Sequence, residues 1–357
     1  MMNYRNYHTL TINGIRLSGE EIIQYCQSSE EVFMQQIGIF VKEWLGESPV
    51  GEVRTSGSTG IPKLIWVEKV KMLESANMTA RYFRFQEGDT ALLALPVSYI
   101  AGKMMVIRAF YSGLHLVCIP PSGNPIAGID ETENIDFAPF TPMQLEAVTD
   151  APQIRRILLG GAPLDPMLEQ KLQSFTSEVY HGFGMTETLS HIALRKVNGV
   201  GKSESYRALE GVTFDTDENN CLIIDAPFLE EEIITRDVVE LLSDTSFIWK
   251  GRIDYVINSG GIKIFPEELE KALSFLTRRF FFAGMPDERF GERVCLFIEG
   301  EAYSDERMIV LHDQLNRALD KYSRPRDIYF IPSFQETGSG KINRMANREI
   351  VLSNLRR

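Results

Sequence analysis

The chain alternates short apolar runs with segments of helical periodicity, and this alternation limits the fold more than any other feature. The run ALLALP (residues 91–96) precedes a helical pattern near 100–111, which leads into the run LHLVCIP (residues 114–120). Two later runs, at residues 155–164 and 177–188, each end in a glycine-containing turn. Strands that alternate with helices are typical of a mostly parallel sheet whose faces are covered by helices. We therefore predict an α/β fold.

Helix starts are predicted from capping signals and apolar periodicity. Ser18 with Glu21, and Ser28 with Glu31, have the spacing of a capping box, so we predict that two helices open the chain. Further helices are predicted near residues 68–83 and 305–321.

The pattern becomes β-rich from Gly211 onward. The segment VTFDTDENNCLIIDAP contains two alternating runs joined at residues 217–220, which predicts a hairpin. Pro266 with Glu267 follows a glycine pair and predicts a helix start. We place a domain boundary near Asp254. The N-terminal domain is then residues 1–253, with a β-rich part at about 205–253, and residues 254–357 form a smaller α+β domain that moves as a unit.

Charge and hydropathy narrow the classes of partner. The formal net charge is −12, which argues against nucleic acid as the main partner because a phosphate backbone requires a basic face. An anionic substrate must then be met by a local basic pocket. The longest apolar region, residues 91–121, is interrupted by Lys103 and Arg108, so we predict no membrane span.

The cysteines are isolated in the sequence, without CxxC pairs or zinc-ligand spacing. We expect Cys26, Cys118, Cys221 and Cys295 to be free buried thiols in a reducing compartment. The first residues lack the apolar core of a signal peptide, and the expected location is the cytoplasm.

A hydroxyl-rich loop lies between two apolar segments at residues 55–63. Glycines expose backbone N–H groups, hydroxyls add donors and a lysine adds charge, which together suit a phosphate cradle. The loop is not a Walker A motif, since Lys63 is followed by Leu64. A plain surface loop is the alternative. The candidate phosphate ligands are Thr55, Ser56, Gly57, Ser58, Thr59, Gly60 and Lys63.

A second motif is GFGMTET, residues 182–188. Glu187 could hold a magnesium ion on phosphates, Thr186 could donate to a phosphate oxygen, and Phe183 offers a flat face for a base. The alternative is a solvated strand end.

Two further motifs lie beyond the predicted domain boundary. Gly260–Gly261 permits close approach of another chain or ligand, with a structural turn as the alternative. Two glycines closely precede Lys341 in TGSGKINR, and a cation on such a loop suits charge stabilisation at a phosphoryl centre. A plain basic tail is the alternative there.

Taken in order, these motifs resemble those of the adenylate-forming superfamily, which includes acyl- and aryl-CoA synthetases, luciferases and adenylation domains. TSGSTGIPK is similar to its phosphate-binding loop, and FGMTE to its Y-G-x-T-E motif with Phe183 for tyrosine. TRD resembles T-G-D, with Arg236 for glycine. GRIDYVINSGGIKIFPEELE resembles the hinge motif, and GMPDERFGERV with TGSGKINR resembles the C-terminal domain. The resemblance extends from about residue 50 to the end.

The resemblance implies a two-step reaction. A carboxylate attacks the α-phosphate of Mg·ATP to give an acyl-adenylate and pyrophosphate, and a thiol, usually of coenzyme A, then displaces AMP. Loop 55–63 would hold the β- and γ-phosphates, Thr186 the α-phosphate and Glu187 the Mg²⁺ ion, while Lys341 would stabilise the charge of the first step.

The remaining roles also follow from the resemblance. Asp254 would be the hinge about which the C-terminal domain rotates between the half-reactions. The segment containing Gly260, Gly261 and Lys263 would contact coenzyme A. The adenine and ribose would be bound by Gly160, Gly161, Ala162, Pro163, His181, Gly182, Phe183, Gly184, Asp237 and Arg252.

The acyl group is indicated by the segment LPVSYIAGKMMVIRAF. It resembles the o-succinylbenzoate–CoA ligases of menaquinone biosynthesis, with Tyr99 in the usual histidine position and Arg108 in a shared basic position. This implies an aromatic diacid, whose unreacted carboxylate needs a cation. The candidates are Lys103, Arg108, His191 and Arg195.

Three alternatives stay open. The enzyme could activate another aryl or acyl acid, it could load a carrier protein in trans, or the chain could bind nucleotide without catalysis. Fewer residues precede the phosphate loop than in the family pattern, which bears on the acyl pocket wall and on a homodimer surface.

Overall fold

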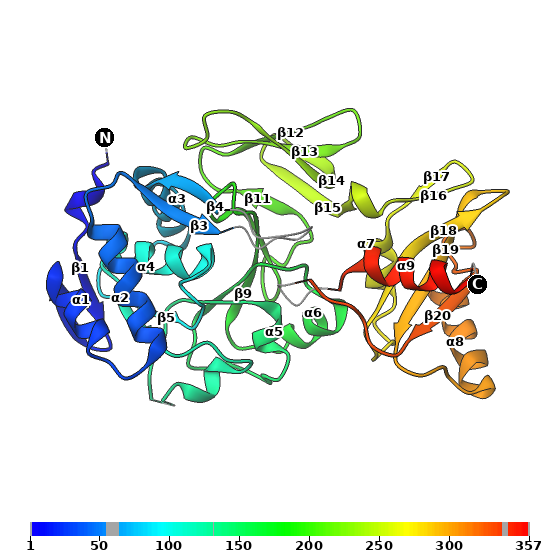
Figure 1. The fold of residues 1–357 in the computed structure, drawn as a ribbon, viewed down its shortest axis with the longest axis horizontal. Helices are drawn as coiled ribbons and strands as arrows, with labels where there is room; N and C mark the ends of the chain where they lie inside the picture. The colour runs from blue at the N-terminus through cyan, green and yellow to red at the C-terminus, as the bar shows by residue number, and fades with distance from the viewer. Residues whose placement is uncertain (1, 55–63, 131, 338–341, 356–357) are drawn as a thin grey trace.

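The computed structural model describes residues 2–54, 64–130, 132–337 and 342–355. The described chain forms a large body and a smaller part at the C-terminal end (Figure 1). The large body contains a four-stranded, a nine-stranded and a two-stranded sheet, and the smaller part contains a five-stranded sheet.

The four-stranded sheet has the order β2-β1-β6-β5. Strands β5 (Thr90–Leu93) and β1 (Thr9–Ile12) both pair in parallel with β6 (His115–Cys118), whereas β2 (Ile15–Ser18) is antiparallel to β1. The main core joins this sheet to four helices and includes the fully buried Trp44. The helices are α1 (Glu20–Gln27), α2 (Val32–Leu45), α3 (Lys69–Phe83) and α4 (Ile100–Ser112).

The start of the chain differs from the prediction, because a β-hairpin precedes the first α-helix. Asn13 and Gly14 have φ of 47° and 82°, as a two-residue type I′ turn requires. The first capping box is half formed, with the Ser18 N–H donating to Glu21 Oε2 at 3.0 Å. The second predicted helix is present as α2, but its predicted capping box is wrong: Ser28 is the C-cap of α1, and α2 begins only at Val32.

The nine-stranded sheet has the order β12-β13-β14-β15-β11-β10-β9-β8-β7. Its parallel part comprises β7 (Ala138–Phe140), β8 (Arg156–Leu159) and β9 (Glu178–Gly184), with α5 (Pro142–Leu145) and α6 (Pro166–Leu172) in the connections. The antiparallel part comprises β10 (His191–Lys196), β11 (Tyr206–Ala208), β12 (Thr213–Thr216), β13 (Cys221–Asp225), β14 (Ile233–Ser243) and β15 (Ser246–Arg252).

The predicted α/β class is therefore confirmed, and the predicted β-rich part continues the same sheet. The hairpin expected at 217–220 joins β12 to β13. A separate hairpin, β3 (Val50–Arg54) with β4 (Leu64–Glu68), flanks the predicted phosphate loop.

The smaller part is built on β16 (Ile257–Ser259), β17 (Ile262–Ile264), β18 (Phe280–Asp287), β19 (Gly291–Glu299) and β20 (Asp327–Ile331), with α7 (Pro266–Ala272), α8 (Asp305–Ala318) and α9 (Arg344–Leu355). Two apolar clusters of its own fill its core. The 3-10 turn η3 (Ile253–Tyr255) leads into it from β15, so the predicted boundary at Asp254 falls in this turn.

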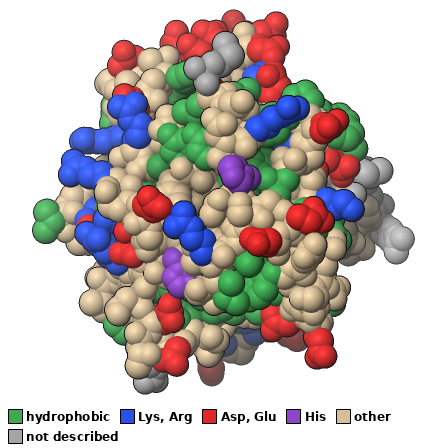
Figure 2. Space-filling view, turned by 90° about the vertical axis from the view of Figure 1, so that its left-hand side faces the viewer, with side chains coloured by type: hydrophobic (Ala, Val, Ile, Leu, Met, Phe, Trp, Pro, Cys, Tyr) green, Lys and Arg blue, Asp and Glu red, His purple; other side chains and the backbone are tan. Residues whose placement is uncertain are grey.

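The cysteines are buried and free as predicted, and the surface carries charges of both signs (Figure 2). On the face shown in Figure 2, acidic and basic side chains are interspersed. The four cysteines are buried and free, and burial raises the pKa of the Cys26 thiol to about 11. Within the described ranges, no helix is long and apolar enough to cross a membrane.

Candidate functional site

The nine-stranded sheet brings together three motifs that are far apart in sequence. The turn at residues 160–163 follows β8, and the segment at 181–187 lies at and beyond the end of β9, which pairs with β8. Asp237 on β14 is the register partner of Arg252 on β15. Strands β10 and β11 connect the two groups, so one sheet supports all of these residues.

His181 links the turn after β8 to the rest of the sheet. Its Nε2 lies 3.0 Å from the Ala162 carbonyl oxygen, and its Nδ1 lies 2.8 Å from the Tyr206 hydroxyl. A carbonyl only accepts, so Nε2 carries the proton and Nδ1 accepts from Tyr206. Burial lowers the pKa of His181 to about 4, with a further contribution from nearby Arg195. Both ring nitrogens are engaged, and His181 therefore fixes the turn rather than offering the ring to a base.

Phe183 packs against two aromatic rings of the antiparallel strands, and Thr186 follows it in the chain. The Phe183 ring lies 5.0 Å from that of Phe247 and 5.7 Å from that of Tyr206, both edge-on. Thr186 is buried, and Glu187 beside it is exposed.

Asp237 is buried, and its carboxylate is oriented by a residue outside every motif. The Trp249 indole donates to Asp237 Oδ1 at 2.9 Å, and the Asp237 N–H donates to Thr235 Oγ1 at 3.0 Å. Asp237 and Arg252 are cross-strand neighbours. The structure thus places the two predicted ribose ligands together.

Asp254 is bound by two arginines. The Arg236 Nε–H donates to both of its carboxylate oxygens, at 2.7 and 2.8 Å, and Arg252 donates to Oδ2 at 3.1 Å. These bonds lower the pKa of Asp254. Arg236, which stands where the family pattern has glycine, therefore ties η3 to β14.

The predicted coenzyme A segment lies in the smaller part of the molecule. Gly260 and Gly261 form the β16–β17 turn with φ of 59° and 86°, and Lys263 is exposed. The predicted ligands Thr55 to Lys63, and Lys341, lie outside the described residues.

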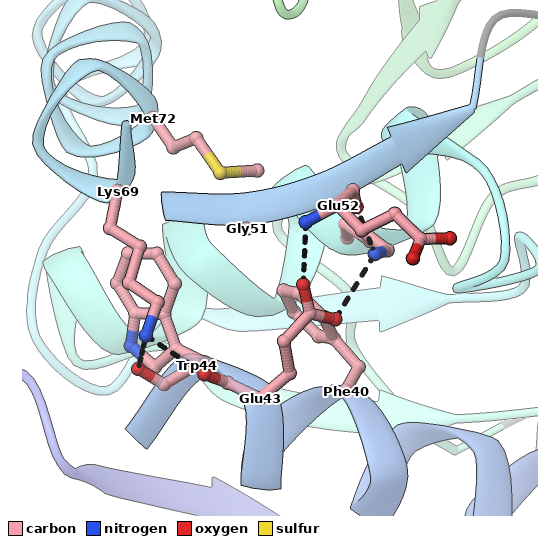
Figure 3. Close-up of a pocket in the computed structure, with 8 residues that line it drawn as sticks. Phe40, Glu43, Trp44, Gly51, Glu52, Lys69 and Met72 are labelled. Atoms are coloured by element: carbon pink, nitrogen blue, oxygen red, sulfur yellow. Dashed lines mark hydrogen bonds and ion pairs between the residues drawn. The ribbon is translucent and has the colours of Figure 1, made fainter. Parts of the chain in front are cut away.

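Lys103 occupies a different place from the one expected. It lines a small pocket between α2, β3, α3 and α4, where its Nζ donates to Glu43 Oε2 at 3.3 Å and to the Glu52 carbonyl at 2.5 Å. Glu43 also accepts from the Glu52 N–H at 2.6 Å (Figure 3). Lys103 neutralises a carboxylate of its own chain, so we no longer assign it to an acyl carboxylate.

Arg195 and His191 are also excluded as the counter-ion. Arg195 donates to both oxygens of Glu169, at 2.8 and 2.7 Å. Burial, and then the charge of Arg108, lower the pKa of His191 well below its usual value, so this ring is neutral.

Arg108 on α4 is the remaining candidate cation. Only 2% of the residue is exposed, and within the described chain it forms no ion pair. Its NH2 group donates to Ser190 Oγ at 2.5 Å, and its Nε has no partner. Burial lowers the pKa of Arg108 to about 9, which leaves it charged at neutral pH. Tyr99 is the half-exposed residue immediately before this helix.

Several residues of the site were not predicted from the sequence. Ser190, Tyr206, Trp249 and Glu169 each orient a predicted residue across strands or from a helix. Their partners lie between 12 and 82 positions away, and none of the four belongs to a local motif.

Glu187 is the candidate metal ligand. Among the described side chains, no three His, Cys, Asp or Glu residues gather into a metal site. One exposed carboxylate is what Mg²⁺ requires when it arrives on a triphosphate that supplies most of its ligands. The residues therefore fit Mg²⁺ held jointly by nucleotide and protein.

Comparison with known proteins shows the family to which the chain belongs. The model of the AMP-binding enzyme family matches residues 46–226. An acyl-CoA synthetase (AMP-forming)/AMP-acid ligase II-like protein from Dyadobacter fermentans is 32% identical, with a TM-score of 0.61, over 92% of this chain and 98% of that chain. The chain therefore belongs to the AMP-binding enzyme family, and its class is that of the AMP-forming acid–CoA ligases.

Two curated relatives carry more particular names. A 2-succinylbenzoate–CoA ligase of Haemophilus influenzae is 27% identical over 88% of this chain and 74% of its own length. A long-chain-fatty-acid–CoA ligase of Mycobacterium tuberculosis is 25% identical over 83% of this chain and 66% of its own length.

Proposed function

We propose that this enzyme joins an aromatic diacid, 2-succinylbenzoate, to coenzyme A at the expense of ATP, as a step of menaquinone biosynthesis. The observation that carries the proposal is Arg108, a buried guanidinium without a carboxylate partner in the described chain. The names of several relatives, among them the Haemophilus influenzae ligase, support the same acid.

A buried cation without a counter-ion is costly, because burial removes its hydration. A ligand carboxylate would compensate for the lost hydration of the cation through charge-assisted hydrogen bonds. Lys103 and Arg195 already have carboxylate partners and His191 is neutral, so Arg108 is the residue suited to the unreacted carboxylate of a diacid.

The other residues have roles in two displacement steps. An oxygen of the reacting carboxylate bonds to the α-phosphorus and pyrophosphate leaves. The coenzyme A thiolate then bonds to the acyl carbon, and AMP leaves. Asp237 and Arg252 would bind the ribose, Phe183 and the turn at 160–163 the adenine, and Thr186 the α-phosphate.

Charge would be handled by residues from both parts of the molecule. Glu187 would hold Mg²⁺, which offsets the negative charge of the phosphates. Loop 55–63 would bind the leaving pyrophosphate, and Lys341 would stabilise charge at the α-phosphate. The segment at 260–263 would contact coenzyme A.

The second candidate is a ligase for another acyl acid, and the similarity to a long-chain-fatty-acid–CoA ligase favours it. Pyrophosphate release distinguishes the two. The acids to compare are 2-succinylbenzoate, the keto acid with hydrogen in place of its ring carboxylate (the monoacid analogue) and a long-chain fatty acid. The proposal expects the diacid to give the highest kcat/KM, followed by thioester on adding coenzyme A. Preference for the fatty acid would overturn it.

Arg108→Met tests the counter-ion directly and keeps most of the buried volume. We expect the KM for 2-succinylbenzoate to rise about 100-fold, since a buried charge pair is lost. The KM for the monoacid analogue should change less than threefold. Arg317→Met, on the exposed face of α8, is the control. Equal losses with both acids would contradict the assignment.

A further inference from the structure

A chain of hydrogen bonds lies behind Arg108 and runs from α4 through the start of β10 to α3. We infer that Ser190, His191 and Thr79 act as a neutral positioning relay, which orients Arg108 toward the acid and thereby sets the preference for a diacid. This inference rests on the proposed function and extends it to residues that do not contact the substrate.

The direction of each bond in the relay can be assigned. Arg108 has only donors, so Ser190 Oγ accepts from its NH2 group at 2.5 Å. The Ser190 hydroxyl hydrogen is then available to His191 Nδ1, 3.1 Å away. An accepting Nδ1 requires the proton on Nε2, which lies 3.2 Å from Thr79 Oγ1. Thr79 in turn donates to the Ser75 carbonyl at 3.2 Å. From Ser190 to Thr79, each hydroxyl or ring donor therefore has an acceptor.

The relay is consistent only with a neutral His191. A doubly protonated ring would place a second cation beside Arg108 and would donate to Ser190 instead of accepting from it. Three of the members, Arg108, His191 and Thr79, are 2%, 8% and 0% exposed, so water does not replace a lost bond there.

The backbone supports this arrangement at Gly184. His191 on β10 is the register partner of Gly184 on β9. A Cβ at Gly184 would collide with the carbonyl and carbon of Ser190 and with the His191 Cα. The hydroxyl of Thr188 also donates to the Ser190 carbonyl at 2.8 Å. Gly184 thus allows the close approach that brings Ser190 against Arg108.

A neutral relay can orient an arginine without cancelling its charge, whereas a carboxylate cannot. Glu169 holds Arg195 with two short bonds but cancels its charge. Ser190 restrains the Arg108 guanidinium through one bond and leaves its charge for a ligand. In the same fold, Arg195 therefore has a structural role, whereas the charge of Arg108 remains available for an anion.

The test compares His191→Leu with His191→Asn, whose introduced side chains have nearly the same shape. The asparagine amide retains an acceptor near the position of Nδ1, whereas leucine has none. We expect His191→Leu to raise the KM for 2-succinylbenzoate about tenfold, the effect of losing a restraint on a charged donor. The KM for ATP, the kcat and the KM for the monoacid analogue should change less than threefold. His191→Asn should restore at least half of the preference for the diacid.

A second pair of variants controls for burial. Ser190→Ala should reproduce the loss of diacid preference. Ser177→Ala removes a buried hydroxyl that donates to the Ala151 carbonyl, outside the relay, and should leave the preference unchanged. In nitrogen-detected NMR of the wild-type enzyme, His191 should show the neutral Nε2–H form at pH 6.

The outcomes separate this inference from the proposed function. If the wild-type enzyme does not prefer the diacid, the proposed function fails. If it does, but His191→Leu and His191→Asn behave alike or both acids suffer equally, the relay is only a packing element and the inference is wrong. A protonated His191 at pH 6 would also overturn it.

Discussion

Trp249 illustrates how a single side chain outside every motif can determine the geometry of a binding residue. Its indole N–H is bonded to Asp237 Oδ1 and therefore orients a buried carboxylate that we expect to bind ribose hydroxyls. A carboxylate is only useful to a ligand if its lone pairs point to fixed positions, and a rigid indole donor supplies that restraint.

Trp249→Phe keeps an aromatic ring and removes the donor. We expect the KM for ATP to rise about fivefold, because one hydrogen bond to a charged group is lost. The KM for the acid should stay unchanged, which serves as the internal control. An equal rise in both constants would indicate a general disturbance of β14 and β15 instead.

Helix α7 carries a buried carboxyl group that lies against β15 of the nine-stranded sheet. Glu267 is 7% exposed, its Oε2 has no partner, and it lies against Gly251 on β15. Burial raises the pKa of Glu267 from 4.5 to about 7, and Arg344 opposes this rise in part. The protonated form is therefore favoured in the folded protein. Its stabilising effect is complete below about pH 4.5 and is lost as the pH rises through about 7.

Glu267→Gln should stabilise the protein above neutral pH, because it removes the buried charge but keeps the shape. We expect a gain of roughly 1–2 kcal/mol in the free energy of unfolding at pH 8, and little change at pH 5. Urea unfolding at both pH values measures this free energy for the variant and the wild type. Glu268→Gln, which alters an exposed carboxylate paired with Lys250, is the matched control. A gain that is equal at both pH values would contradict the assigned titration.

The sequence predicts elements well where the signal is local. Helices α3, α4 and α8 follow their apolar periodicity to within three residues, and the hairpin at 217–220 follows its turn residues. The opening hairpin was missed although Asn13–Gly14 is a strong turn signal, because a capping pattern nearby favoured a helix. Motifs supplied the candidate residues of the site, but they did not indicate which side chains would restrain them. Tyr206 meets His181, and Ser190 meets Arg108, only after strands and helices have paired.

At the scale of the whole molecule, the contact between Arg236 and Asp254 joins the two parts. Arg236 lies on β14 of the large sheet, and Asp254 lies in the turn that leads to the smaller part. The Arg236 side chain is 62% exposed, so the pair contributes modestly and is screened by salt. Its two-oxygen geometry still restrains the turn in one orientation.

Arg236→Ala should loosen this turn. We expect chymotrypsin to cleave after Tyr255 about threefold faster at low salt, and the difference from the wild type to shrink near 1 M salt. Arg317→Ala breaks an exposed Arg317–Asp313 pair within α8 and provides the comparison. Unchanged cleavage after Tyr255 would show that other contacts hold the turn.

The short strand β11 bears on how nucleotide binding would affect the motion of the nine-stranded sheet. Its three residues connect β10, which leads to the His181 and Phe183 side of the sheet, with β15, which carries Arg252. The antiparallel strands beyond it therefore dock onto the rest of the sheet through a narrow seam, reinforced by the rings of Tyr206 and Phe247. A nucleotide whose base lies on one side and whose ribose lies on the other would hold the two groups of strands together. Bound ATP should therefore slow amide exchange along β11.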